Sequence, residues 1–138
     1  MAKGENSKYI VTDLTLPEEM QAGAAEYAQW ATRILWLDGD VVPDSFQVNC
    51  SWYRKPTVTP AKAHTHDYDE VLAFFSSLPD DPHNLGAEAE FWIEDEKYTI
   101  TNSSFVFVPK GIKHAPLRFN RVDRPVFHFT LGHGKMYF

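Results

Sequence analysis

The sequence predicts an all-β fold, a sandwich or barrel built from short strands. From about residue 31 onward, short runs of branched and aromatic residues alternate with polar breaks such as Asp38-Gly39-Asp40 and Asn102-Ser103-Ser104. Many short strands separated by turn residues are typical of β-sandwiches and barrels. Long helices of the kind expected in a protein of alternating strands and helices are missing.

The individual elements follow from the same pattern. Pro17 and two acids after Leu16 predict a short helical segment that ends near Ala28. A loop containing Pro79 and Pro82 is expected over residues 76–85. The expected strands cover residues 9–11, 32–37, 46–53, 63–66, 70–75, 88–93, 97–101, 105–108, 113–119 and 126–131. We expect one structural domain, with an N-terminal arm over 1–30 and a barrel over 31–138.

Composition limits the classes of function. The chain has 138 residues, is 43% hydrophobic and 14% aromatic, and carries a formal net charge of -6. This charge argues against a nucleic-acid partner, which requires a basic face. A single cysteine, Cys50, excludes an intramolecular disulfide and a cysteine-based zinc site. With no apolar run long enough for a membrane span and no apolar leader in the first eight residues, we expect no membrane partner and a cytoplasmic protein.

Two short motifs carry residues that bind metals. The first contains His64, His66 and Glu70. Two histidines two apart on a strand share a face, but a straight strand would carry Glu70 about 20 Å from His64. Glu70 can therefore join the histidines only if the chain reverses over residues 67–69, where two aspartates suit a turn.

The second motif contains Pro109, Gly111 and His114. Pro and Gly predict a tight bend, with His114 at the start of the next strand. Three imidazoles and one carboxylate suit one divalent transition metal (Fe, Mn, Ni, Zn, Co or Cu) and suit Ca or Mg poorly. We predict His64, His66, Glu70 and His114 as the ligands.

These motifs resemble the two sequence motifs of the cupin superfamily, HxHxxxE and PxGxxH. The order of the motifs and the strands between them agree, and the resemblance covers about residues 31–131. Ser103 replaces the glycine that usually opens the second motif, and Arg118 falls where an asparagine often closes it. The resemblance implies a double-stranded β-helix, or jelly-roll barrel, with the metal inside, and a homodimer.

Other residues have two interpretations each. Arg33 either clamps a substrate carboxylate or lies on the outer face of an edge strand. Glu90 is either a general base facing the metal or a solvent-exposed acid. His128 is either a proton shuttle or a core histidine, and the polar face of Asn49 and Ser51 either lines a pocket or is solvated. The large aromatics, Trp36, Trp52, Phe74, Phe91, Phe105, Phe107, Phe119 and Phe129, are expected to fill the barrel.

The resemblance implies three classes of function. The first is an enzyme that acts on a small oxygenated molecule chelated to the metal, and a dioxygenase is favoured by a small margin. The second is a non-oxidative isomerase, lyase or hydrolase that uses the same metal as a Lewis acid. The third is a module that binds a small ligand without turnover.

Overall fold

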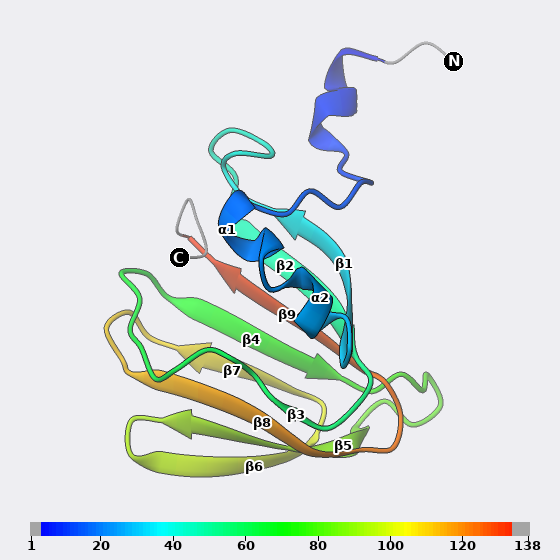
Figure 1. Ribbon diagram of the computed structural model, residues 1–138, viewed down its shortest axis with the longest axis vertical. Helices are drawn as coiled ribbons and strands as arrows, with labels where there is room; N and C mark the ends of the chain where they lie inside the picture. The colour runs from blue at the N-terminus through cyan, green and yellow to red at the C-terminus, as the bar shows by residue number, and fades with distance from the viewer. Residues whose placement is uncertain (1–3, 134–138) are drawn as a thin grey trace.

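The computed structural model describes residues 4–133, and its strands form two antiparallel sheets. One sheet has the order β1-β2-β9-β4-β7 and the other β3-β8-β5-β6 (Figure 1). The first contains β1 (Ala31–Leu37), β2 (Gln47–Tyr53), β9 (Val126–Gly132), β4 (Glu70–Phe75) and β7 (Ser104–Val108). The second contains β3 (Thr57–Val58), β8 (His114–Val122), β5 (Asn84–Ile93) and β6 (Glu96–Asn102). This architecture confirms the predicted all-β jelly-roll fold.

Side chains from both sheets meet in one core. Alternate residues of each strand point inward, as the two-residue period of a strand requires. Phe74 on β4, Phe91 on β5 and Phe119 on β8 are almost fully buried there, and Val126 of β9 lies in the same cluster. Burying large apolar side chains of this kind stabilises the fold by about 1.5–3 kcal/mol each.

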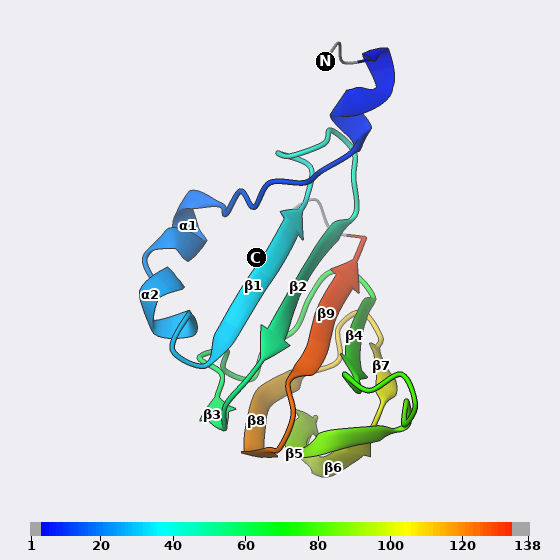
Figure 2. The same ribbon diagram turned by 90° about the vertical axis from the view of Figure 1, so that its right-hand side faces the viewer.

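The N-terminal segment lies outside the two sheets. A 3-10 helix, η1 (Glu5–Tyr9), stands away from the sheets in both views, and the short helices α1 (Glu18–Gln21) and α2 (Ala24–Tyr27) lie beside β1 (Figures 1 and 2). The predicted helical segment is therefore present as two single turns. In the part of the chain that the structure describes, no helix has the length and apolar character that crossing a membrane requires.

Four sequence expectations need correction. Residues 9–11 form no strand, because the chain there is the end of η1 and an extended segment. Residues 63–66 contain only an isolated bridge between His64 and His114. The two-residue strand β3 was not expected, since it lies just after Pro56. Phe105 and Phe107 are 69% and 58% exposed, because β7 directs Val106 and Val108 inward instead. Two further aromatics expected in the barrel, Trp52 and Phe129, also face outward, because their neighbours on β2 and β9 are the buried residues.

Candidate metal centre

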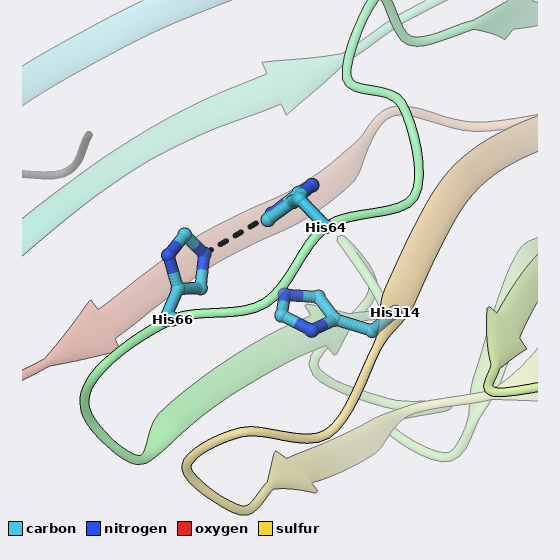
Figure 3. Close-up of side chains that lie close together, drawn as sticks. All are labelled: His64, His66 and His114. Atoms are coloured by element: carbon cyan, nitrogen blue, oxygen red, sulfur yellow. Dashed lines mark hydrogen bonds between the residues drawn. The ribbon is translucent and has the colours of Figure 1, made fainter.

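Two chain segments that are far apart in sequence bring three histidines together. His64 and His66 lie on the loop before β4, and His114 is the first residue of β8 (Figure 3). Their candidate ligand nitrogens all lie within 4.8 Å of one another. These three side chains can therefore hold one metal ion.

Backbone hydrogen bonds fix the two segments against each other. His64 and His114 exchange both of their backbone hydrogen bonds, His64 N to His114 O at 3.0 Å and the reverse at 2.9 Å. Gly111 donates its N–H to the carbonyl of His66 at 3.0 Å and has a φ of 83°, a value that glycine adopts without strain. The side chain of Asp69 accepts from the Lys110 N–H at 2.8 Å. The bends predicted around 67–69 and 109–111 thus form one joined unit.

Glu70 begins β4, and its carboxylate is buried beside the histidines. Its Oε1 lies 3.1 Å from His114 Nε2, and its Oε2 lies 3.7 Å from His66 Nε2. The chain reversal before β4 therefore brings Glu70 into the cluster, as the spacing argument required. Sequence and structure agree on the four side chains that come together here.

The orientation of the rings leaves the correct nitrogens for a metal. Nδ1 of His64 bonds to the carbonyl of Lys62, and Nδ1 of His114 bonds to the carbonyl of Ile112. A carbonyl accepts only, so each Nδ1 carries the proton and each Nε2 has a free lone pair. Metal-bound histidines are usually held by such a bond from the other ring nitrogen. Tyr68 stacks on His66 with ring centres 4.7 Å apart, which fixes the plane of the third ring.

The cluster fits a metal and fits poorly without one. His64 Nε2 lies 3.1 Å from His66 Nε2, the separation expected for two nitrogens each about 2.1 Å from one ion and at right angles. His114 Nε2 and Glu70 Oε2 are buried without a hydrogen-bond partner, and the contact of His114 with Glu70 lacks hydrogen-bond geometry. Leaving such atoms unpaired costs about 1–3 kcal/mol each, and a bound cation removes that cost.

The pKa values of the histidines reflect crowding. Burial lowers the pKa of His66, and the neighbouring His64 and His114 lower it further against the opposing effect of Glu70. For His114, burial acts to lower the pKa, but the contacts with Glu70 and the Ile112 carbonyl outweigh it and raise the pKa. A metal ion bound at this site would therefore compete with a proton on His114.

The cluster opens onto a cavity of about 350 Å³ between the sheets. His128 and Arg33 both line it, so each points inward. His128 is buried, bonds through Nδ1 to the carbonyl of Ala73 at 2.9 Å and stacks on Phe74. Burial lowers the pKa of His128 to about 4, so the ring is neutral near pH 7 with Nε2 as an acceptor.

Glu90 does not line this cavity. It lies on the outer side of β5, where its carboxylate is 2.9 Å from Lys97 Nζ and 3.9 Å from Arg118 Nη1. The hydrogen bond from Lys97 is the main cause that lowers the pKa of Glu90. The general-base interpretation of Glu90 is therefore corrected, because β5 directs Ala89 and Phe91 inward instead.

Several cavity residues were not singled out from the sequence. Thr130 and Tyr53 line the cavity, as do Tyr27 and Trp30 at the N-terminal segment. Asn49 lines the cavity as well, which favours the pocket-lining interpretation of its strand face over the solvated one. Thr130 could have been predicted as a cavity residue, because it lies two residues after His128 on β9 and therefore shares its face.

No protein-family model matches the sequence, and no curated protein matches it. Solved structures do resemble it. The DMSP lyase DddQ from Ruegeria pomeroyi DSS-3 has 21% identity and a TM-score of 0.54, over 92% of this chain and 58% of DddQ. A sugar phosphate isomerase described as a cupin, from Silicibacter pomeroyi DSS-3, has 14% identity and a TM-score of 0.53, over 86% of this chain and 66% of the isomerase. The chain has the cupin fold.

A further cupin-like match is a recombinant oxalate oxidase in complex with glycolate, with 13% identity and a TM-score of 0.56. The match covers 94% of this chain and 61% of the oxidase. This chain therefore spans less than two thirds of the length of DddQ and of the oxidase. At these identities the likeness establishes the cupin fold and leaves the reaction to the chemistry of the site.

Proposed function

We propose that this cupin is a metal-dependent enzyme that acts on a small oxygenated organic molecule, with His64, His66, Glu70 and His114 as the ligands of one divalent transition metal. The observation that carries the proposal is the convergence of these four side chains beside a cavity that three of them, His64, Glu70 and His114, line. Two polar atoms of this cluster are buried without hydrogen-bond partners. When bound, such a metal supplies Lewis acidity and, as iron, access to O2 chemistry. Four protein ligands leave one or two positions for a substrate and water.

A dioxygenase-type reaction remains the favoured class, because the cavity is poor in bases. Glu70 is the one carboxylate among the described residues that line it. His128 has a pKa of about 4, which makes it a weak proton acceptor near pH 7. Isomerases and lyases that remove a proton from carbon need a stronger base than this cavity offers, whereas oxidation with O2 places less demand on one. Aromatic side chains such as Tyr53 and Phe91 line the cavity and give it apolar walls.

Metal content tests the ligand assignment first. Protein purified without chelators is expected to contain close to one transition metal per chain by elemental analysis. A His64→Ala/His114→Ala double variant should lose that metal, and the exposed loop variant His83→Ala should keep it. Full metal content in the double variant would refute the assignment.

The reaction class is tested next with the metal-loaded protein. Iron-loaded protein is screened for O2 consumption with catechols, diketones, thiols and small carboxylic acids, with the double variant as the control. Oxygen uptake that depends on the substrate and on the intact cluster supports a dioxygenase. Turnover of a ketose or an enol by the manganese form without oxygen uptake would favour the non-oxidative class, and tight binding without turnover a ligand-binding module.

We also propose that two copies associate through the outer face of the five-stranded sheet. Phe105, Phe107 and Leu131 are exposed on that face at 69%, 58% and 36%. Phe75 contacts Phe105, with ring centres 5.4 Å apart, and also contacts Phe129, which in turn contacts Phe127. A contiguous apolar face of this kind is typical of an interface, and a face without charges can pack on its own copy about a two-fold axis.

A further inference from the structure

Arg33 places a cation in the cavity without an acidic partner. It lies on β1 at a register shift between Arg33 and Leu35, is half-buried, and lines the cavity that the metal ligands also line. Among residues 4–133, no carboxylate lies within ion-pair distance of its guanidinium. A partly buried charge without a counter-ion is costly, so this position favours an anion from outside the chain.

The guanidinium is held in one orientation. Its Nη1 donates to Asn49 Oδ1 at 3.0 Å, and Asn49 Nδ2 in turn donates to Thr130 Oγ1 at 2.9 Å. The central carbon lies 4.1 Å from the ring centre of Tyr27 and 5.3 Å from that of Trp36. Aromatic contacts of this kind stabilise a cation without neutralising it. In the described part of the chain Asn49 is the acceptor for Arg33, so most of the five N–H donors of the guanidinium stay available to a ligand.

The charge balance of the cavity also favours an anion. Although the chain has a net charge of -6, Arg33 and Glu70 are the one cation and one carboxylate among the described lining residues, apart from the histidines. With a divalent metal held by neutral imidazoles, the cavity is net positive. Between apolar walls such charges act more strongly on a ligand than they would in water.

We propose that Arg33 binds a carboxylate of the substrate while another oxygen group of the same molecule reaches the metal centre, which makes the substrate class a small organic acid. This inference rests on the proposed function. Asn49 on β2 is level with Leu72 of β4 across β9, and Glu70 lies two residues farther along β4, so Asn49 and Glu70 stand about 12 Å apart. Both side chains reach into the space between them, and the cavity of about 350 Å³ limits the ligand to a short molecule.

The test measures binding of dicarboxylates of increasing length. Malonate, succinate and glutarate, each with its half-amide, are titrated into zinc-loaded protein by calorimetry. Fluorescence of Trp30 and Trp36, which line the cavity, gives a second reading. Wild-type protein is expected to bind at least one diacid about 10- to 100-fold more tightly than its half-amide, the range for a lost charge-assisted hydrogen bond.

Arg33→Gln should abolish this preference, whereas Arg118→Gln, the same change on an exposed strand position, should keep it. Asn49→Asp is the more discriminating variant, because it supplies Arg33 with a carboxylate at the place of the amide. If Arg33 served the fold alone, the new ion pair would maintain or raise thermal stability and leave ligand affinity unchanged. The proposal expects maintained stability together with a loss of diacid affinity of about tenfold or more.

Metal content of every variant separates the two proposals. A protein that takes up no transition metal would refute the proposed function. Zinc-loaded protein that binds none of the three diacids, or whose Arg33→Gln and Asn49→Asp variants bind them as tightly as wild type, would overturn only the role of Arg33. Should Arg33→Gln fail to fold, Asn49→Asp alone decides the question.

Discussion

Acid pH should destabilise this protein through His128, which is buried and bonded to the Ala73 carbonyl. Burial lowers the pKa of this histidine from 6.5 to about 4. Below pH 6.5 the unfolded chain takes up a proton on His128, whereas the folded chain stays neutral until about pH 4. Because the unfolded state binds more protons in this window, the stability contributed by neutral His128 is full above pH 6.5 and is lost as the pH falls to 4.

The magnitude follows from the difference between the two pKa values. Each pKa unit corresponds to 1.36 kcal/mol, so the loss between pH 6.5 and 4 is about 3 kcal/mol. The comparison variant is His128→Asn, whose side-chain amide can donate to the Ala73 carbonyl in place of Nδ1 but does not titrate. This variant loses the stacking on Phe74 and should be less stable than wild type at pH 7.5.

The assay is urea unfolding at several pH values between 7.5 and 4.5, with a chelator present throughout. Titration of the metal ligands then acts equally on both proteins and cancels in their difference. The stability advantage of wild type over His128→Asn should shrink by about 2 to 3 kcal/mol across this range. Two curves that run parallel from pH 7.5 to 4.5 would show that His128 is not held neutral by burial, and would refute the reasoning.

Three further predictions concern the metal, the packing and the outer face. Zinc at about 100 times its dissociation constant should stabilise the fold by about 2.7 kcal/mol and raise Tm by several degrees in scanning calorimetry. The Glu70→Gln variant should show a smaller rise in Tm. A Tm that no transition metal changes would contradict the site. Gly132→Ala should cost about 1–3 kcal/mol in urea unfolding, since a Cβ there would lie 2.5 Å from both the Gln47 amide and the Tyr68 ring, whereas Gly23→Ala, with nothing within 4 Å, should cost little. Phe107→Ser should shift the protein toward monomer in sedimentation velocity without changing its metal content, and a wild-type protein that is strictly monomeric would contradict the dimer.

The four proposed metal ligands could be grouped from the sequence because their spacing is itself a constraint on the fold. His64 and Glu70 would be too far apart on a straight strand, so the motif can form a site only where the chain turns, and the structure has a turn there. The bend at Gly111 has the same property, since its positive φ favours glycine. Residues whose roles depend on local geometry were thus found without knowledge of the tertiary structure.

The orientation of the other strands could not be found this way. A two-residue period shows which residues share a face but not which face is inward. On β7 the aromatic set, with Phe105 and Phe107, was expected to point inward, and the smaller Val106 and Val108 do so instead. On β5 the period likewise leaves open whether Glu90 or its neighbour Phe91 faces the barrel, and Phe91 is the one that does.

The strand β9 shows why the polarity of side chains does not predict which face of a strand points into a barrel that contains a polar cavity. Its inward residues include His128 and Thr130, and its outward ones include Phe127 and Phe129, which reverses the usual order of apolar inside and polar outside. A polar interior is costly unless each group finds a partner, and an aromatic exterior is costly unless something covers it. A ligand in the cavity would offset the cost of the polar interior. A second copy packed on the sheet would offset the cost of the aromatic exterior. The inverted strand therefore connects the substrate site with the proposed dimer face: the same alternation that turns His128 toward the cavity necessarily turns Phe127 and Phe129 toward the outer surface.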